Sequence, residues 1–551
     1  MYPLNKRQPP GDTEPLNESI GVQNAWSFDS GDVLFVSRAQ SRLFRNPVEV
    51  LEAQTVEDVL PAMRRIEDAV EDGLYAAGFV AYEAAPAFDP ALSVHSAPGK
   101  PLLWFGLYAT QGTYHDCPEA AGSYSLEIWE PLVSQSEYCH SIGRIREWIA
   151  AGDTYQVNYT FPMHSRFHGD PAGWFSDLCR AQHADHCALV HTGRFIVLSA
   201  SPELFFRLAD ERITMKPMKG TRPRGLFPAQ DREAARNLVE SEKDRAENIM
   251  IVDLIRNDLG RICIPGSVVV DDLFRAERYE TVWQMTSTVS GKTRARMSEV
   301  FSALFPSGSV TGAPKVRTMQ IIHEVEPLPR GVYCGSVGYW LPGQTAEFNV
   351  AIRTAVLNTK TSEVVYHVGG GVTWDSTSEG EFAECMVKAA VLSHARPPFE
   401  LLESLLWEGE YFLLDLHLDR IEASAEYFGF TFSRDAVREL LQETASSLAT
   451  RSTPAKVRVL LAHDGRLRVD VAAVSPALHV RLGFARAPVN QGDVFLYHKT
   501  TFRNVYDSAR ASRPDCDDVL LWNSRGEVTE STTANLVAEL NGQLMTPPVE
   551  C

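Results

Sequence analysis

A lysine held on a tight turn is the first residue in this sequence that could do chemistry. The run Pro-Met-Lys-Gly-Thr, Pro217 to Thr221, sets Lys219 between a proline and a glycine. Proline fixes one backbone angle and glycine permits angles that other residues avoid, so the amine is held in a set place. This mounting suits a nucleophile. A solvated lysine in a basic loop is an equally good interpretation of these residues alone, because Arg222 and Arg224 follow.

Two predicted helix starts each carry a glutamate that could bind a cation. Ser241 and Asp244 have the spacing of a capping box, which leaves Glu247, one turn further on the same face, without a local role. Positions 378 and 381 repeat the arrangement, with Glu384 one turn on. Two inward glutamates would suffice for Mg²⁺, which usually takes one or two carboxylates, water and the ligand's own oxygens. Two solvated helix faces are the alternative.

Two glycine-containing loops could receive carboxylates. Gly308 to Lys315 (Gly-Ser-Val-Thr-Gly-Ala-Pro-Lys) runs into a predicted helix with proline near its first position, which aims free backbone amides at an anion. Its spacing differs from that of a P-loop. The second loop, Gly369-Gly370-Gly371, follows an apolar strand predicted at 364–368 and lets backbone approach a ligand closely. Neither run alone identifies a site.

The composition is that of a folded acidic protein. With 551 residues the chain is long enough for about three or four domain-sized units, and 44% hydrophobic residues can fill their cores. A net charge of −19 disfavours nucleic acid and anionic membranes as partners. The polar start, Met1 to Ser19, has no apolar core, and no apolar run is long enough to span a bilayer. We therefore expect a soluble, unexported protein.

The scatter and spacing of the cysteines disfavour disulfides and a zinc site. Nine scattered cysteines with no Cys-x-x-Cys pair fit a reducing cytoplasm. Cys179, His183, His186 and Cys187 lie within nine residues, but their spacing does not match paired zinc ligands. Because Trp174 and other apolar residues precede them at helical spacing, the segment is predicted to be an amphipathic helix.

The hydrophobic pattern predicts a mixture of helices and strands, and so an α+β fold. Helices are expected at 61–70, 137–151 and 241–257, with proline in the first turn of the first and with Ile249, Val252 and Ile255 facing inward in the last. Strands are expected at 32–38, 77–82, 155–161, 194–199 and 204–207. The segment 393–398 ends in two prolines and predicts a linker between a first unit, 1–392, and a second unit, 399–551.

Several motifs of the first unit occur together and in a characteristic order. They are Ser201-Pro202-Glu203, Pro217 to Thr221, Glu247 to Arg261, Gly308 to Lys315, Ile352-Arg353-Thr354 and Glu381 to Lys388. In these motifs the unit resembles the chorismate-binding family and, within it, the aminodeoxychorismate synthases. The resemblance implies a β-sandwich flanked by helices. It implies that Glu247 and Glu384 bind Mg²⁺ and that Glu203 is the general acid toward the leaving hydroxyl. It also implies a set of residues that hold the substrate: Arg353, Tyr339, Thr311, Gly369, Gly370 and Gly371.

The resemblance also gives Lys219 a role. Aminodeoxychorismate synthases commonly carry lysine at this position, where it is thought to attack ring carbon 2 of chorismate as the hydroxyl leaves carbon 4; ammonia then adds at carbon 4. Anthranilate synthases usually carry alanine there, and a histidine where this chain has Gln284. A nucleophilic lysine must lose its proton, so we expect Lys219 to be desolvated or near other cations. The chain has no Gly-x-Cys-x-Gly glutaminase motif. Ammonia is therefore expected from solution or from a partner glutaminase subunit.

The second unit combines a lysine, a glutamate and a hydroxyl-rich turn. Phe495 to Lys499 is predicted to be a strand ending on the lysine, and a hairpin turn at Asn523 to Gly526 delivers Glu530 and then Thr532. An ordinary hairpin with a polar turn is the alternative. With the His-Leu-Asp-Arg run at 417–420, these residues resemble the class IV aminotransferase fold and, in this fused context, the aminodeoxychorismate lyases. The resemblance implies pyridoxal phosphate. Lys499 would hold the cofactor and move the proton, Glu530 would face the pyridine nitrogen, and Arg420 and Thr532 would bind the phosphate.

The end of the chain bears on the second unit. The sequence stops at Cys551, where relatives continue through a glycine-rich segment. We therefore expect an incomplete second unit with weak or absent binding of pyridoxal phosphate. Taken together, the motifs favour a bifunctional enzyme that converts chorismate to 4-aminobenzoate and pyruvate. Two alternatives stay open: an anthranilate- or isochorismate-forming enzyme with a vestigial second unit, and a non-catalytic chorismate-binding regulator of a glutaminase.

Overall fold

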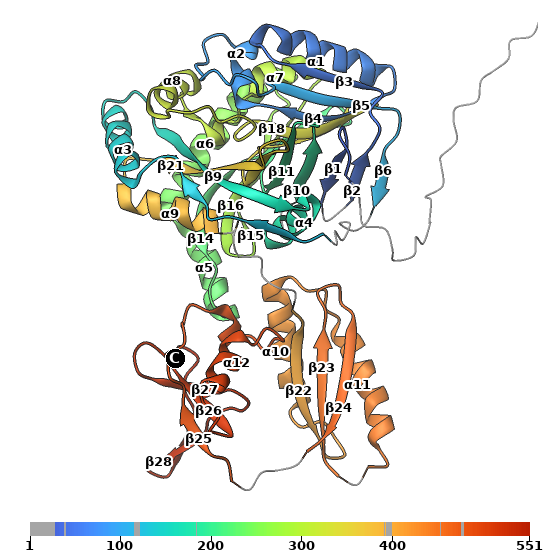
Figure 1. The fold of residues 1–551 in the computed structure, drawn as a ribbon, viewed down its shortest axis with the longest axis vertical. Coiled ribbons are helices and arrows are strands. Elements are labelled where there is room, and N and C mark those ends of the chain that lie inside the picture. The colour runs from blue at the N-terminus through green and yellow to red at the C-terminus, as the bar shows by residue number, and fades with distance from the viewer. Residues whose placement is uncertain are drawn as a thin grey trace, which may run out of the picture.

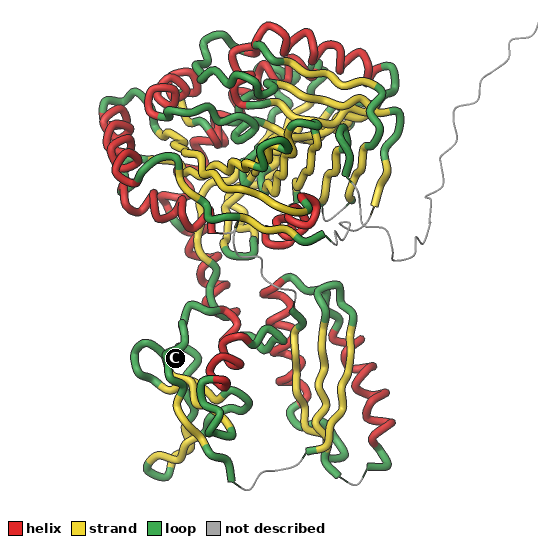
Figure 2. The backbone as a smooth tube through the Cα atoms, in the orientation of Figure 1, coloured by secondary structure: helices red, strands yellow, loops and turns green. Residues whose placement is uncertain are grey.

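The computed structural model describes residues 28–37, 40–114, 122–182, 185–390, 392, 399–451, 453–474 and 479–551. The described chain forms two bodies, an upper one from residues before 393 and a lower one from residues after 398 (Figure 1). Strands fill the middle of the upper body and helices cover its outside, whereas the lower body holds smaller sheets (Figure 2). This is the mixed α+β arrangement that the hydrophobic pattern predicts.

The upper body is a sandwich of two large antiparallel sheets. The first sheet has 11 strands; its main path is β17 (Gly312–Ala313), β9 (Gln156–Gly169), β21 (Glu363–Val372), β20 (Thr354–Asn358), β11 (Phe195–Ser201), β10 (His186–His191), β1 (Val33–Val36), β2 (Ser41–Phe44) and β6 (Gly112–Tyr114), and β7 (Tyr124–Leu126) and β8 (Glu130–Pro131) pair with β9. The second has 10 strands; its main path is β14 (Met218–Pro223), β16 (Val282–Lys292), β13 (Arg212–Lys216), β12 (Leu204–Ala209), β19 (Thr345–Asn349), β18 (Ser336–Leu341), β4 (Tyr75–Val80), β5 (Leu103–Tyr108) and β3 (Glu49–Ala53), and β15 (Val269–Arg278) pairs with β16.

Side chains of both sheets meet in a shared core. Phe35 of β1 and Val197 of β11 pack in one cluster with Phe79 of β4, Trp104 of β5 and Val337 of β18. Successive side chains of a strand point to opposite faces, so each strand can give one set to this inner core and the other set to helices outside. All six residues of β5 are buried, as expected for a strand that is covered on both faces.

Amphipathic helices cover the outer faces of the sandwich. The second sheet packs with α1 (Val56–Glu71), α6 (Glu242–Gly260) and α7 (Met297–Leu304), and the first with α3 (Gln135–Ala150), α4 (Pro171–Gln182), α8 (Lys315–Val325) and α9 (Ser378–Ala390). In α1 the apolar stripe is Val59, Met63, Ile66 and Val70, which are all buried. Short elements fill the connections: η1 (Tyr82–Ala84), α2 (Ala85–Phe88), η2 (Gly308–Val310) and α5 (Pro228–Glu240).

The lower body contains two small three-stranded sheets and a hairpin. The antiparallel sheet β22 (Leu401–Trp407), β23 (Ala455–Leu461) and β24 (Leu467–Ala473) packs against α10 (Leu414–Phe428) and α11 (Arg434–Leu448). The second sheet joins β25 (Leu482–Phe484), β26 (Asp518–Trp522) and β27 (Val528–Ser531), with α12 (Asn504–Ala511) against β26. The remaining elements are η3 (Val494–Leu496) and the pair β28 (Ala538–Leu540) and β29 (Gln543–Met545).

The predicted helices of the first unit all occur, with different ends. The segments predicted at 61–70, 137–151 and 241–257 lie in α1, α3 and α6. Pro61 lies inside α1 and not in its first turn, because the helix already begins at Val56 with Glu57 and Asp58 near its N-terminus. In α6 the inward row includes Ile251, Val252 and Ile255, whereas Ile249 is 45% exposed.

Three local predictions were wrong. Gly369 to Gly371 lie inside β21, paired with β9, and not in a loop. Phe495 to Lys499 is not a strand, because its first residues form the 3₁₀ turn η3. The helix α4 ends at Gln182, so His186 and Cys187 belong to β10. His183 lies outside the described residues.

The described residues contain no group of three or more His, Cys, Asp or Glu side chains placed to hold a metal. No disulfide joins any two of the described cysteines. A search of the same residues finds no helix with the length and apolar character needed to cross a membrane.

Candidate functional site

The upper body has a cavity of about 360 Å³ that collects most of the residues with predicted chemistry. We call it the upper cavity. It is lined by predicted residues from several elements: Glu203, Lys219, Glu247, Arg353, Gly369, Gly370, Gly371 and Glu384. Helices α6 and α9 supply the two glutamates of the predicted metal pair, and β14 and β21 supply the lysine and the glycines. Segments that are far apart in the sequence therefore meet in one place.

Lys219 is mounted by a β-bulge. The register between β14 and β16 shifts between Met218 and Thr221, and Gly220 has a φ of +92°. A bulge of this kind turns one side chain out of the ordinary alternation, and the positive φ is one that glycine adopts without strain. A Cβ at Gly371 would lie 3.1 Å from Lys219 Nζ, so the glycine in β21 leaves room for the amine. The proline-to-glycine run thus fixes the lysine, but by a bulge within β14 and not on the tight turn that the sequence predicted.

The burial of Lys219 makes its amine easier to deprotonate. Burial lowers the pKa of Lys219, and Lys388 acts in the same direction, whereas the carboxylates of Glu203 and Glu247 oppose the shift. Desolvation penalises the charged form of an amine, which is the usual way to make lysine a nucleophile. The result is a lysine whose proton is easier to remove than that of an exposed lysine.

Glu203 has the properties of an acid that keeps its proton near neutral pH. Its side chain is 4% exposed, and burial raises its pKa to about 7, although a hydrogen bond from Ser309 and the nearby Lys219 act to lower it. A general acid works best when its pKa is close to the working pH. Glu203 and Lys219 therefore form a buried acid and amine pair on one cavity wall.

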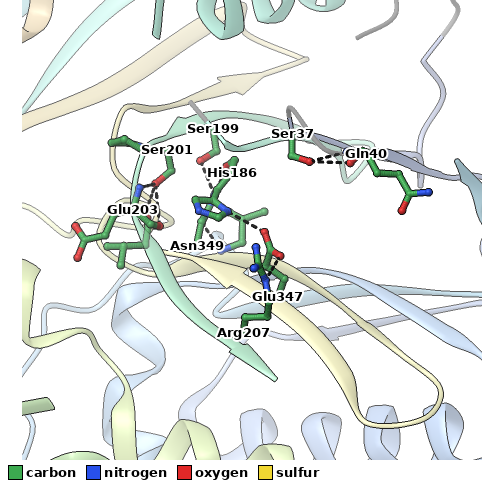
Figure 3. A network of polar contacts seen from close by, with 12 residues as sticks. Ser37, Gln40, His186, Ser199, Ser201, Glu203, Arg207, Glu347 and Asn349 are labelled. Carbon is green, nitrogen blue, oxygen red and sulfur yellow. Dashed lines mark hydrogen bonds and ion pairs between the residues drawn. The ribbon is translucent and has the colours of Figure 1, made fainter. Parts of the chain in front are cut away.

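The backbone of Glu203 is fixed by a polar network behind the cavity (Figure 3). The Glu203 amide donates to Ser201 Oγ at 3.2 Å, and Ser201 Oγ donates to the carbonyl of Val350 at 2.6 Å. The amide of Val350 in turn donates to the carbonyl of Glu203 at 3.0 Å. In Figure 3 the Glu203 carboxyl group points away from this network. The network positions the residue through its backbone and leaves the carboxyl group on the cavity side.

The same network continues along β19 to a second set of charges (Figure 3). Asn349 donates to the His186 carbonyl at 2.9 Å and to Ser199 Oγ at 3.3 Å. Glu347 bonds His186 Nδ1 at 2.8 Å and accepts from Arg207 Nε at 2.8 Å. Burial alone would raise the pKa of Glu347, but these two partners lower it to about 2. Glu347 of β19 is thus bonded to His186 in the first sheet and to Arg207 in the second, which anchors the strand to both sheets.

The carboxylates of α6 and α9 form the acidic side of the upper cavity. Glu384 pairs with Lys388 at 2.8 Å, and Glu381 accepts a hydrogen bond from Ser376 at 2.6 Å. Glu381 was predicted to cap α9, but it lines the cavity instead. Burial raises the pKa of Glu247 and of Glu381. A cation would stabilise the charged forms of Glu247 and Glu381, whereas Glu384 would have to exchange its ion pair with Lys388 for the metal. With water and substrate oxygens completing the coordination, these carboxylates suit Mg²⁺.

Arg353 is a half-buried cation that lines the upper cavity. Burial lowers its pKa, and the nearby Tyr366 and Tyr279 oppose the shift. Arg353 Nη1 donates a hydrogen bond to Gln182 Oε1. Among the described residues no carboxylate forms an ion pair with it. A guanidinium that is desolvated without a carboxylate is well suited to bind one from a ligand, because its planar fork matches both oxygens.

Two predicted substrate residues lie elsewhere. Tyr339 does not line the upper cavity; its ring packs on Phe35, with centroids 5.0 Å apart, and Arg42 lies over it at 5.2 Å. Its position in β18 turns it to the core between the sheets. Thr311 is buried, and its hydroxyl donates to the carbonyl of Ser307 at 3.0 Å, within its own loop.

Sequence reasoning missed several residues that line the upper cavity: Asn158, Ser309, Tyr333, Tyr366 and His367. Tyr333 and His367 stack with their ring centroids 5.0 Å apart. The alternating strand pattern ahead of the glycines could have pointed to Tyr366, since every second residue of β21 faces the same way. Asn158 and His367 lie in β9 and β21, and Ser309 and Tyr333 lie in η2 and in the segment before β18, so all four reach the cavity only through the folded sandwich.

The lower body has its own cavity, of about 580 Å³, which we call the lower cavity. Its lining includes all four predicted residues of the second unit, namely Arg420, Lys499, Glu530 and Thr532. Burial lowers the pKa of Lys499, and the Arg420 charge adds to the shift. Glu530 accepts a hydrogen bond from the hydroxyl of Tyr506 at 2.8 Å. A lysine with a lowered pKa and a carboxylate in one cavity fit the imine-forming amine and the ring-nitrogen partner that pyridoxal phosphate needs.

The predicted phosphate groups of the lower cavity already have protein partners. Arg420 Nε and Nη2 donate to the two oxygens of Glu403, at 2.6 and 2.7 Å. The hydroxyls of Thr532 and Thr533 donate to Asp518. Burial alone would raise the pKa of Asp518, but these hydroxyls and others lower it to about 2. A phosphate would have to share or replace these bonds, a relation that the sequence did not reveal.

Comparison with known proteins agrees with this geometry. The family model described as chorismate binding enzyme matches residues 25–394, and the model described as amino-transferase class IV matches residues 399–551. The chain therefore belongs to the chorismate binding enzyme family, and the resemblance inferred from its motifs is confirmed.

Individual relatives match mainly the upper body. Aminodeoxychorismate synthase component 1 of Salmonella typhimurium is 39% identical over 269 residues, which is 48% of this chain and 59% of that protein. Aminodeoxychorismate synthase of Streptomyces griseus is 43% identical over 279 residues, which is 50% of this chain and 38% of that protein. The chain thus spans about half the length of these curated relatives.

A solved structure shows the same fold at lower identity. Anthranilate synthase component I from Streptococcus pneumoniae superposes with a TM-score of 0.57 and 21% identity, over 68% of this chain and 96% of that one. At this identity the likeness establishes the sandwich fold and not a reaction.

Proposed function

We propose that the upper cavity aminates chorismate at ring carbon 4 to give 4-amino-4-deoxychorismate. The single observation that carries the proposal is the buried pair of Lys219 and Glu203, an amine with a lowered pKa beside a carboxyl group whose pKa is about 7. The curated relatives named aminodeoxychorismate synthase support the same reaction.

The pair can supply both halves of a displacement. The neutral Lys219 amine attacks ring carbon 2, the double bond shifts, and the bond between carbon 4 and its hydroxyl breaks. Glu203 gives its proton to the departing oxygen, so that water leaves. Ammonia then adds at carbon 4, the electron pair returns, and the bond from carbon 2 to Lys219 breaks. The surplus proton of the ammonium returns to Glu203, so that chorismate and ammonia become aminated product and water.

The rest of the cavity would position the substrate. Arg353 offers a guanidinium for one carboxylate, and the glycines of β21 let the ligand approach the backbone closely. Glu247 and Glu384 would hold Mg²⁺, which would screen the other carboxylate from the acidic wall. This metal role rests on the donor set and on the family resemblance.

The lower cavity would convert the aminated product to 4-aminobenzoate and pyruvate. Pyridoxal phosphate would supply an electron sink for the carbon that loses its proton. Lys499 would move that proton, Glu530 would keep the pyridine nitrogen protonated, and Arg420 and the turn at Thr532 would face the phosphate. Support comes from the class IV aminotransferase match over residues 399–551 and from the lowered pKa of Lys499.

Ammonia would come from a separate glutaminase subunit or from solution. The relatives from Salmonella typhimurium and Escherichia coli are named component 1, which implies a second component in those proteins. An excess of ammonium salt should replace the partner in an assay.

The test is to incubate the chain with chorismate, Mg²⁺ and ammonium and to identify products by mass. We expect 4-amino-4-deoxychorismate or, if the lower cavity acts, 4-aminobenzoate. Anthranilate or isochorismate as the product, or no turnover with ammonium, would contradict the proposal.

A further inference from the structure

A third cavity, of about 380 Å³, lies where the two bodies meet, and we call it the junction cavity. Helix α5 reaches from the upper body toward α10 of the lower body (Figure 1). One wall is formed by Arg232 and Arg236 of α5, with Arg278 and Trp283 from the ends of β15 and β16. The opposite wall belongs to α10, which contributes Tyr427 among others.

The walls of the junction cavity are fixed by buried contacts. Arg224 Nε pairs with Asp231 at 2.7 Å, and Trp283 Nε1 donates to the same carboxylate at 2.8 Å. Arg224 also lies over the Tyr427 ring at 4.2 Å, and the Tyr427 hydroxyl donates to the carbonyl of Gly225 at 2.7 Å. The acid on the cavity floor is thus neutralised from behind, and the two bodies are held together at this point.

The junction cavity is a positive site on an acidic protein. Arg232 and Arg236 are four residues apart, so they share one face of α5. Arg278 approaches from β15, and its Nη1 donates to the carbonyl of Glu426. The cavity lining holds these three arginines against a single other acid, Glu426, whereas the whole chain has a net charge of −19. Such a local reversal of charge attracts small anions.

The junction cavity also lies between the two sites. On β16 the neighbours Trp283 and Gln284 face different cavities: Trp283 lines the junction cavity and Gln284 lines the upper cavity. On the other side, the Tyr427 ring lies 4.4 Å from the ring of His498, which lines the lower cavity next to Lys499. The strand β16 therefore separates the junction cavity from the upper cavity, and the Tyr427 and His498 rings separate it from the lower cavity.

We propose that the junction cavity binds a small ring dicarboxylate, and specifically the aminated product on its way from the upper to the lower cavity. This inference rests on the proposed function, because amination leaves both carboxylates of chorismate in place. Guanidinium groups bind carboxylates bidentately, and Arg232 and Arg236 on one wall can take one carboxylate while Arg278 takes the other. Trp283 offers an aromatic face to the ring.

The first test measures binding without catalysis. Arg353→Met removes the predicted carboxylate partner in the upper cavity, and equilibrium dialysis with labelled chorismate then reports the junction cavity. We expect about one equivalent of weak, salt-sensitive binding, weakened at least tenfold by adding R232Q and R236Q. The matched control adds R64Q and R451Q, two exposed arginines outside the cavity that change the net charge equally. Benzoate, with one carboxylate, should compete at least tenfold less well.

Absence of binding to the Arg353→Met chain would overturn the proposal, as would equal binding by the two triple variants or equal competition by benzoate.

The second test separates a product in transit from an outside dicarboxylate. During turnover with ammonium, rapid gel filtration should recover more aminated product with the unaltered chain than with R232Q/R236Q, while initial amination rates stay equal. Equal recovery would overturn the transit role. Failure of amination itself would contradict the proposed function. The dialysis experiment would still test dicarboxylate binding in the junction cavity, because it does not depend on catalysis.

Discussion

The two predicted catalytic lysines, Lys219 and Lys499, differ in what surrounds them. Lys219 lies in a cavity where a buried acid, an arginine without a carboxylate partner and a set of carboxylates face open space. Lys499 lies in a cavity whose arginine is paired with Glu403 and whose hydroxyls donate to Asp518. The upper cavity leaves Arg353 without a carboxylate, although Glu384 there is paired with Lys388. In the lower cavity Arg420 and the threonine hydroxyls are already bonded to protein carboxylates. Residue types that fit a ligand therefore do not show whether those residues are available to bind it in the folded protein.

The largest expected effect on the upper cavity comes from removing the Lys219 amine. Lys219→Ala should reduce amination with ammonium by at least on the order of 10⁴-fold, because the covalent step loses its nucleophile. Lys216→Ala is the matched control, since Lys216 belongs to the neighbouring strand, pairs with Glu277 at 2.6 Å and does not line the upper cavity. Product formation followed by mass spectrometry gives the measurement. Comparable rates for the two variants would show that Lys219 is not the nucleophile.

Removing the acid should cost less. Glu203→Gln is expected to lower kcat/KM by roughly 10²- to 10⁴-fold, the usual contribution of a general acid. Burial raises the Glu203 pKa to about 7, so the protonated acid is lost as the pH rises through that value. In the unaltered chain the rate should therefore fall above about pH 7, and this alkaline limb should be absent in Glu203→Gln. An unchanged alkaline limb in the variant would assign it to another group.

The arginines give a direct test of the contrast between open and satisfied charges. Arg353→Met should raise the KM for chorismate by roughly 10- to 100-fold, because a charge-assisted hydrogen bond contributes about 1.5–3 kcal/mol. It should leave the melting temperature unchanged or higher, since a half-buried guanidinium without a carboxylate partner is replaced by an apolar chain. A large fall in melting temperature with unchanged KM would mean that Arg353 is a structural residue.

The sandwich could be predicted from the sequence much better than the arrangement of the cavities. Alternation and helical periodicity place α1, α3, α6 and many strands within a few residues, because these signals are local. That Lys219 is held in place could also be predicted, since proline and glycine constrain the backbone wherever they occur, but its position at a bulge of β14 in place of a tight turn could not. The direction of the Tyr339 side chain could not be predicted, because it depends on which face of β18 meets the other sheet. Likewise, the partners of Arg420 and Thr532 come from residues 17 and 14 positions away, brought close only by the fold.

In the lower cavity, the ion pair between Arg420 and Glu403 should contribute to the stability of the fold. Glu403 is 2% exposed and bonds both Arg420 and His417. Glu403→Gln should therefore lower the free energy of unfolding by roughly 1.5 kcal/mol, because the charge-assisted hydrogen bonds weaken while water partly replaces the partner of the Arg420 side chain, which is 47% exposed. Glu400→Gln is the control, because its pair with Arg468 at 3.1 Å is exposed and should contribute less than about 1 kcal/mol. Denaturant unfolding measures both; equal losses would contradict the assignment.

The sign of the pH effect follows from the same pair. Burial alone would raise the pKa of Glu403, but the bonds from Arg420 and His417 lower it below the ordinary value. A carboxyl group with a lowered folded-state pKa stabilises the fold fully above its unfolded pKa, which is about 4.3. This stabilisation is lost as the pH falls through the lower folded-state value. Glu403→Gln should flatten that part of the stability profile, and Glu400→Gln should not.

The smallest expected effect concerns Asp518, which accepts hydrogen bonds from Thr532 and Thr533. A hydroxyl has one hydrogen to donate, so a threonine bonded to Asp518 cannot also donate it to a phosphate. Asp518→Asn weakens this competition and removes a negative charge, and should tighten the binding of pyridoxal phosphate about fivefold, corresponding to roughly 1 kcal/mol. Asp517→Asn, at the adjacent residue, should leave the affinity unchanged. An absorbance titration decides: weaker binding in Asp518→Asn would mean that Asp518 shapes the turn for the phosphate and does not compete with it.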